Sequence, residues 1–281
     1  MPARVELFGV EIDPLRMDQA VAQVLSWVRD EGSWCRFVVT PNVDHVVMLQ
    51  HHAGLQAAYR DAGLVLVDGA PVLWSSRFLR QPVPERVAGS DLVPALFDSV
   101  QDDQRLRIYL LGAAPGVADR AAANIHRRWP AVEVVGTYSP PPGFEKSDAE
   151  NDAIIGRVAA ARPDVLIVGL GAPKQELWVH KHRSRLAAKA VLCVGATIDF
   201  LAGERSRAPV WMQRVGMEWI YRVAREPRRL ASRYAWDAWI FPRLLVREWW
   251  RLRSAASSQK PAIGKNSKHE IRNPKQIPST K

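Results

Sequence analysis

The chain has 281 residues, of which 47% are hydrophobic, so it can bury the core of one large α/β domain or two small ones and is not a disordered chain. Its formal net charge of +10 is uneven, because residues 200–281 carry 18 Lys and Arg against 6 Asp and Glu, which leaves residues 1–199 at a net charge of −2. No stretch reaches the ~18 apolar residues of a membrane-spanning helix, and no signal peptide opens the chain. We therefore expect a cytoplasmic protein without a transmembrane segment.

The two cysteines, Cys35 and Cys193, both lie in apolar runs that are typical of strands. A disulfide or a metal site would use such residues, but buried thiols in a reducing compartment are the simpler interpretation. We expect neither a disulfide nor a metal centre.

The first two predicted strand-to-helix turns carry polar candidates. The strand over residues 37–39 ends at a proline, which cannot donate a hydrogen bond to a sheet. Asn42 is a good N-cap for the helix that follows, so Thr40 and Asn42 should lie on the turn. A second apolar strand over residues 64–67 ends at Asp68. Open α/β sheets present polar groups to ligands at such turns, and we expect Thr40 and Asp68 to face one pocket.

A loop over residues 78–91 comes next, and a Ser90 or Asp91 cap is predicted to open the helix after it. Arg86 in this loop has two interpretations, a solvated charge or a ligand for an anion, and its spacing does not separate them. A βαβ unit then spans residues 106–136. Its glycine turn lacks the G-x-G-x-x-G spacing and no acidic residue ends its second strand, so the evidence for dinucleotide binding is weak.

The strand predicted over residues 164–168 runs into a turn that contains Gly169, Gly171 and Gln175. Two glycines let the backbone approach a phosphate or a sugar, while a tight turn that needs glycine for its geometry alone is the simpler alternative. Asp199 follows the last predicted strand. It is a site candidate because a carboxylate in an apolar run is costly unless it is hydrogen-bonded or used.

Six predicted strands alternate with helices, a pattern typical of a Rossmann-like α/β fold with a mostly parallel sheet and helices on both faces. The carboxyl ends of parallel strands meet at one edge of the sheet, so one cleft has room for all the polar candidates. The candidates at this edge are Thr40, Asp68, Gly169, Gln175 and Asp199.

Residues 205–253 are basic and hold 6 of the 11 tryptophans. If Pro227 only kinks a helix that starts at Pro209, a ridge of arginines forms along one face. Its members are Arg222, Arg225, Arg229 and Arg233. A solvated helix face is the ordinary interpretation of such a run, but interleaved tryptophans favour an anionic membrane surface. We predict a core over residues 1–204, this helical appendage, and a disordered tail over residues 254–281.

Several short segments also form a consistent set of motifs. They are Thr40-Pro41-Asn42, Val67-Asp68-Gly69, Pro84-Glu85-Arg86-Val87-Ala88-Gly89-Ser90-Asp91-Leu92, Leu110-Leu111-Gly112-Ala113, Gly169-Leu170-Gly171-Ala172-Pro173-Lys174-Gln175-Glu176, Arg207-Ala208-Pro209 and Glu218-Trp219-Ile220-Tyr221-Arg222. Together, and in this order, they resemble the WecG/TagA/CpsF glycosyltransferases, glycosyltransferase family 26. The resemblance covers residues 5–234 of the chain.

This resemblance implies transfer of N-acetylmannosamine, its uronic acid or a hexose from a UDP-sugar to a polyprenyl-diphosphate-linked saccharide. The transfer would invert the anomeric carbon and occur at the inner face of the plasma membrane, in cell-surface polysaccharide biosynthesis. The family works without a metal or a cofactor, and the sequence agrees because it has no D-x-D pair to hold a divalent cation against a diphosphate. The resemblance also implies a homo-oligomer in solution, and it involves no nucleic acid.

On the matching positions, the resemblance implies that Asp68 is the general base for the acceptor hydroxyl. Thr40 and Asn42 would orient the sugars beside it. Donor binding would fall to Arg86, Gly169, Gly171, Gln175 and Asp199.

The resemblance further implies that arginines of the C-terminal helix fold over the site and neutralise the leaving diphosphate. Arg222 and Arg229 match two of these positions. A third family arginine falls near Ser232, with Arg233 one position along, so the chain departs from the pattern there.

Two other classes of protein share parts of these features. A sugar-nucleotide oxidoreductase or epimerase would share the α/β sheet, but it needs the glycine fingerprint that is missing after every predicted strand. A nucleic-acid-binding protein would explain the pI of about 10.0, yet the basic charge lies on a tryptophan-rich helix rather than on a known base-recognition motif.

Overall fold

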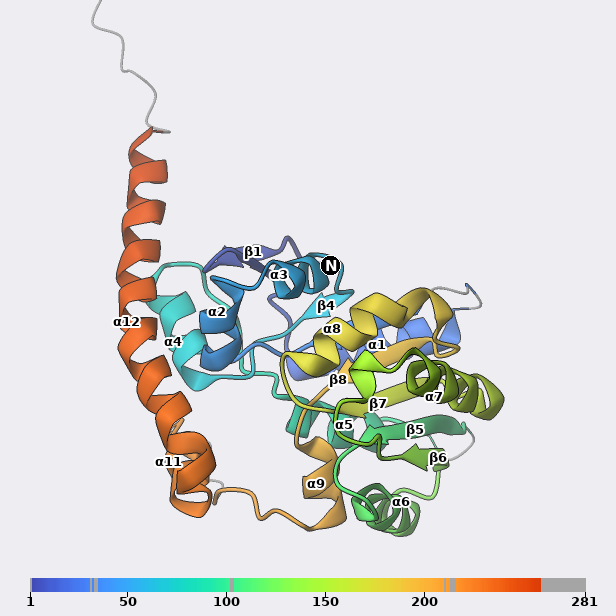
Figure 1. Cartoon of the computed structure of the whole chain (residues 1–281). Coiled ribbons are helices and arrows are strands. Elements are labelled where there is room, and N and C mark those ends of the chain that lie inside the picture. The colour runs from blue at the N-terminus through green and yellow to red at the C-terminus, as the bar shows by residue number, and fades with distance from the viewer. Residues whose placement is uncertain are drawn as a thin grey trace, which may run out of the picture.

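The computed structural model describes residues 2–30, 32, 35–101, 104–209, 211–212 and 216–258. Six strands form its central sheet: β3 (Arg36–Val39), β4 (Leu64–Val65), β5 (Leu106–Gly112), β6 (Val132–Tyr138), β7 (Val165–Gly169) and β8 (Ala190–Cys193). They lie in the order β4-β3-β8-β7-β5-β6, and every pair is parallel (Figure 1). A separate antiparallel hairpin is formed by β1 (Val5–Leu7) and β2 (Val10–Ile12).

Helices cover both faces of the sheet. Their bounds are α1 (Met17–Arg29), α2 (Val43–Leu49), α3 (Ala53–Arg60), α4 (Ala70–Phe78), α5 (Gly89–Asp98), α6 (Val117–Arg128), α7 (Asp148–Ala161), α8 (Lys174–His182), α9 (Thr197–Ala202), α11 (Glu218–Arg225) and α12 (Pro227–Ser258), with short 3-10 turns η1 (Phe144–Lys146) and η2 (Arg183–Arg185). Successive strand residues face opposite sides, so Val38 packs with α1, α5, α6 and α9, while Phe37 and Val39 pack with α2, α3, α7 and α8. The predicted α/β fold class is confirmed.

The C-terminal helix α12 docks on the core beside α2 and the β1–β2 hairpin (Figure 1). Phe241 packs against Phe8, with the ring centroids 5.4 Å apart. Two turns further along the helix face, the buried carboxylate of Glu248 accepts a hydrogen bond from the backbone N–H of Phe8 at 3.0 Å. The helix is therefore held by apolar packing and by one polar contact that is shielded from water.

Two details of the predicted appendage are wrong. Pro227 does not kink a continuous helix, because α11 ends at Arg225 and α12 begins at Pro227, where a missing N–H is tolerated in the first turn. The proposed arginine ridge is thus divided between two helices. At the other end, α12 extends to Ser258, so residues 254–258 are helical rather than disordered. Residues 259–281 lie outside the described part.

Candidate functional site

Two strand-to-helix turns meet at the carboxyl ends of β3 and β4. Asn42 is the N-cap of α2, as predicted, and its side-chain oxygen accepts a hydrogen bond from the backbone N–H of His45 at 3.3 Å. The backbone N–H of Asp68 donates to the carbonyl of Pro41 at 3.0 Å. This bond fastens the second turn directly to the first. Thr40, at the start of the first turn, is buried.

A cavity of about 380 Å³ lies beside these turns. Its wall is formed by the N-terminal ends of α2 and α4 on the core side, and by α11 and α12 on the other side. Three of the predicted site residues line it: Asn42, Asp68 and Arg86. Of the others, Thr40, Gly169, Gly171, Gln175 and Asp199 are not part of the described wall. The cavity therefore brings together only part of the set expected in one cleft.

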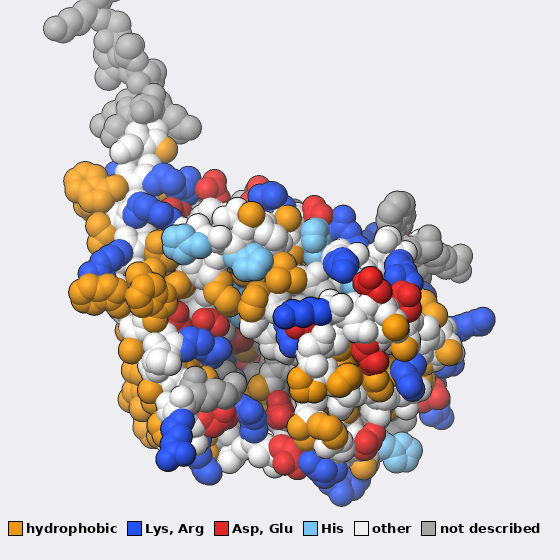
Figure 2. Space-filling model, in the orientation of Figure 1, with side chains coloured by type: hydrophobic (Ala, Val, Ile, Leu, Met, Phe, Trp, Pro, Cys, Tyr) orange, Lys and Arg blue, Asp and Glu red, His pale blue; other side chains and the backbone are white. Residues whose placement is uncertain are grey.

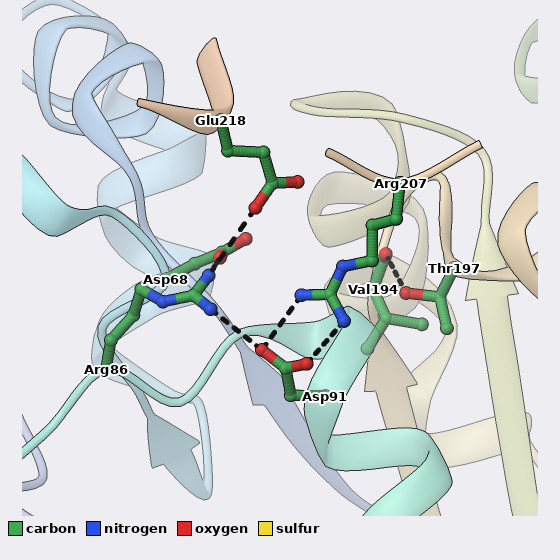
Figure 3. Close-up of polar contacts among 7 residues, drawn as sticks. All are labelled: Asp68, Arg86, Asp91, Val194, Thr197, Arg207 and Glu218. Atoms are coloured by element: carbon green, nitrogen blue, oxygen red, sulfur yellow. Dashed lines mark hydrogen bonds and ion pairs between the residues drawn. The ribbon is translucent and has the colours of Figure 1, made fainter. Parts of the chain in front are cut away.

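Arg86 is the centre of an ion-pair network in this wall (Figure 3). Its guanidinium donates to Oδ2 of Asp91 at 2.9 Å, and Nη1 lies 3.6 Å from Oδ1 of Asp68 and 3.9 Å from Oε2 of Glu218. Its side chain is 20% exposed. The interpretation of Arg86 as a solvated charge is therefore wrong, and contact with an anionic ligand stays a prediction.

Asp91 has a different role from the helix cap predicted for it. The helix α5 starts at Gly89 after an N-cap at Ala88, and Asp91 lies in its first turn. There its carboxylate accepts hydrogen bonds from Arg86 and from Arg207, whose Nη2 is 2.9 Å away (Figure 3). Burial acts to lower the pKa of Arg207, but the hydrogen bond to Asp91 and the negative charges nearby outweigh it and raise that pKa.

A buried polar cluster connects the first turn to α8. Nε2 of His45 lies 3.4 Å from Oε1 of Glu176, a carboxylate with no exposed surface. Burial acts to lower the pKa of His45, but its contact with Glu176 outweighs burial and raises it. The amide of Gln175 donates to Glu176 at 2.8 Å and accepts from the N–H of Gly195 at 3.1 Å. Gln175 thus supports the turn after β8, and its role in donor binding stays a prediction.

The two glycines after β7 are needed for different reasons. A Cβ on Gly169 would lie 2.7 Å from the carbonyl oxygen of Gly195, so the close approach of two strand ends requires glycine. Gly171 has φ +77°, and a Cβ there would meet nothing within 4 Å, so the space beside its backbone is open. Asp199 lies in the first turn of α9, with its Oδ1 3.8 Å from Nε of Arg205.

The predicted phosphate-binding arginines are on the two C-terminal helices. Arg222 lies in α11 and Arg229 in α12, but both side chains are outside the described part of the structure. Arg233 does line the cavity, and its Nη1 lies 3.4 Å from Oδ2 of Asp44. Arg233, which lies one position after the expected place of the third family arginine, is thus part of the wall.

Of the four acidic residues in the described wall, sequence analysis named only Asp68 as a site residue; it missed Asp44, Glu218 and, on α12, Asp237. This side chain lines the cavity, is only 3% exposed, and its Oδ2 has no hydrogen-bond partner among the described residues. Burial raises the pKa of Asp237 to about 6, and the charge of Asp44 adds to the effect, while Arg233 and His45 oppose it. A signal was present, because Asp237 and Glu248 are the only acidic residues of the basic segment from Pro227 to Ser258.

Comparison with known proteins places the chain among sugar-transferring enzymes. Residues 5–255 match the model of the glycosyl transferase WecG/TagA/CpsF family. The match extends beyond residue 234 and includes most of α12. The chain is also similar to N-acetylglucosaminyldiphosphoundecaprenol N-acetyl-beta-D-mannosaminyltransferases of Staphylococcus aureus strains MRSA252 and MW2. Each is 27% identical over 228 residues, which cover 81% of this chain and 87% of the relative.

We expect Asp237→Asn to stabilise the folded protein above pH 6. A carboxyl whose pKa rises from 3.8 to about 6 on folding binds its proton more tightly when folded, so stability falls as the pH rises through this range. The uncharged amide should remove a cost of about 3 kcal/mol near neutral pH, and the gain should vanish near pH 4. Thermal denaturation of both proteins at several pH values measures this.

The matched control for that prediction is Glu248→Gln on the same helix. The Glu248 carboxylate is equally buried but accepts hydrogen bonds from Phe8 and Arg251, so its replacement should give no gain at any pH. A stabilisation by Asp237→Asn that is the same at pH 4 and above pH 6 would contradict the raised pKa.

Proposed function

Because this chain belongs to the WecG/TagA/CpsF family and is a glycosyltransferase, we propose that it transfers N-acetylmannosamine, its uronic acid or a hexose from a UDP-sugar to a polyprenyl-diphosphate-linked saccharide. The observation that carries the proposal is that Asp68, Asn42 and Arg86 line one cavity at the carboxyl ends of β3 and β4. The names of the staphylococcal relatives support a sugar on a lipid diphosphate as the acceptor.

In this proposal, Asp68 removes the proton of the acceptor hydroxyl as its oxygen attacks the anomeric carbon of the donor sugar. The bond from that carbon to the UDP oxygen breaks on the opposite face, its electron pair stays on the phosphate, and the configuration inverts. Arg222 and Arg229 neutralise the leaving diphosphate, a role that a divalent cation takes in other transferases. Neither a metal nor a cofactor takes part in this scheme.

The first test is transfer of radiolabelled sugar from a panel of UDP-sugars to a short-chain lipid-diphosphate-N-acetylglucosamine, with EDTA present. We expect product from one donor and an unchanged rate in EDTA. A requirement for added metal would contradict the proposed neutralisation by arginine. No product from any donor would contradict the proposed substrates.

We expect Asp68→Asn to lower kcat by about 10²- to 10⁴-fold, because an amide cannot accept the hydroxyl proton. The Kd for the UDP-sugar, measured by calorimetry, should change little since Asn has nearly the same shape. Asp152→Asn is the control, because this carboxylate is 60% exposed and forms a surface ion pair with Arg185. Turnover by Asp68→Asn at the wild-type rate would show that another group is the base.

The same proposal places the enzyme on the inner face of the plasma membrane, bound peripherally through α12. Large side chains are more than half exposed along this helix: Trp236, Trp239, Val246 and Trp250. Arginines are interleaved with them, and the guanidinium of Arg243 stacks 3.6 Å from the centroid of Trp239. Figure 2 shows these two classes of side chain side by side along the edge formed by α12. In the described residues no helix is long and apolar enough to cross a bilayer.

A triple variant tests this surface: Trp236→Ser, Trp239→Ser and Trp250→Ser. Each serine removes a large exposed indole from the interface, so binding to phosphatidylglycerol vesicles should weaken roughly tenfold or more. Flotation measures the bound fraction, with phosphatidylcholine vesicles as the uncharged control. Wild-type binding to duplex DNA that is tighter than binding to these vesicles would instead favour a nucleic-acid-binding protein.

A further inference from the structure

Three carboxyl groups of the described wall have no part in the proposed transfer: Glu218, which pairs with Arg86, and also Asp237 and Asp44. Asp237 comes from α12 and Asp44 from the first turn of α2, so the appendage and the core each supply one of these two. The two are close enough for the charge of Asp44 to raise the pKa of Asp237. Arg233 lies 3.4 Å from Asp44 and His45 also acts on Asp237, so the pair is surrounded by titratable groups from both elements.

Among the described residues, Oδ2 of Asp237 makes no hydrogen bond that would hold α12 on the core. The helix is held by Phe241 against Phe8 and by Glu248, whose carboxylate accepts bonds from Phe8 and Arg251. Both acidic residues of the helix are buried, yet only Asp237 has a carboxyl oxygen without a partner in the described chain. Burying a polar group without a hydrogen bond costs free energy. A ligand in the cavity would supply the missing bond.

The charges of the wall indicate which ligand fits. Among the lining side chains that the structure describes, four are acidic and two are basic: Asp44, Asp68, Glu218 and Asp237 against Arg86 and Arg233. Asp68 and Glu218 are paired with Arg86, whereas Asp44 and Asp237 share the single arginine Arg233. The side of the wall next to Asp237 and Asp44 therefore disfavours an anionic group and favours one that is uncharged and rich in hydroxyl or amide donors. An uncharged sugar has this chemistry, whereas a uronic acid or a phosphate does not.

We propose that Asp237, together with Asp44, binds the sugar unit of the acceptor by accepting hydrogen bonds from its hydroxyl or amide groups, and that this pair selects an uncharged sugar over one with a carboxylate. The inference rests on the proposed function, because it names the substrate that occupies the cavity beside Asp68. Of the residues expected to bind the donor, Arg86 lines the cavity, but Gly169, Gly171, Gln175 and Asp199 are not part of its described wall. The donor would therefore extend away from the cavity, and the acceptor sugar would occupy the side next to Asp237 and Asp44. Asp237 acts here on binding and specificity and takes no proton in the transfer.

The test compares Asp237→Ala, Asp237→Asn and the control Glu248→Gln in the full chain. The acceptors are a short-chain lipid-diphosphate-N-acetylglucosamine and its analogue with a carboxylate at C6. Loss of a hydrogen bond to a charged group should raise the acceptor KM of Asp237→Ala about tenfold, with kcat and the donor KM within about twofold of wild type. Asp237→Asn removes the negative charge. It should lower the ratio of kcat/KM for the uncharged acceptor to kcat/KM for the carboxylate analogue by about tenfold. Glu248→Gln should leave the acceptor KM and the preference for the uncharged acceptor unchanged.

Two results would overturn the inference. One is an unchanged acceptor KM in Asp237→Ala, and the other is an equal rise in Glu248→Gln, which would indicate a general disturbance of α12. Calorimetric titration with the uncharged acceptor alone separates this inference from the proposed reaction. Weaker binding by Asp237→Ala than by wild type supports the role of Asp237 even if no donor gives product. If the wild type does not bind this acceptor, the inference about Asp237 is overturned, even if the enzyme transfers sugar to other acceptors.

Discussion

The guanidinium of Arg86 joins three carboxylates from separate segments of the chain, and the site is organised around it. Asp68 follows β4, Asp91 belongs to α5 and Glu218 to α11, and all three approach Arg86 within 4 Å. These side chains are partly exposed, between 16% and 32%, so water screens each pair and the gain in stability is modest. The network matters for position, since one planar group sets where Asp68 lies relative to the helix that closes the cavity.

The parts of the fold that sequence predicts are those encoded by neighbouring residues. Short apolar strands such as residues 37–39 are bounded by their own proline and N-cap, so the end of β3 and the cap at Asn42 are readable locally. The same local logic brings Asp68 next to the turn at Pro41 and Asn42 once the strands are parallel and adjacent. Six such strands alternating with helices leave little choice of architecture.

The cavity wall depends instead on contacts that are distant in sequence. Arg207 meets Asp91 across 116 residues, and Glu248 meets Phe8 across 240. Contacts between residues so far apart in sequence leave no repeating pattern that could be recognised in the sequence. The docking of α12 depends on the shape and apolar area of the folded core. For this reason the sequence marks Asp237 as an unusual acidic residue but does not place it in the cavity wall. Gln175 and Asp199, expected in one cleft with Asp68, are not part of the described wall.

The helix α12 has one buried face and one exposed face. At 1.5 Å per residue its 32 residues form a rod of roughly 48 Å, with Phe241, Asp237 and Glu248 turned to the core and Trp236, Trp239 and Trp250 turned outward. Because the helix is rigid, a surface that binds its outer face also sets the orientation of the cavity, which the inner face helps to form. For an enzyme whose acceptor is confined to a membrane plane, the rate of turnover would then depend on the number of acceptors per unit of membrane area and not on their bulk concentration. Adding lipid that contains no acceptor would lower this rate even when the total amount of acceptor is constant.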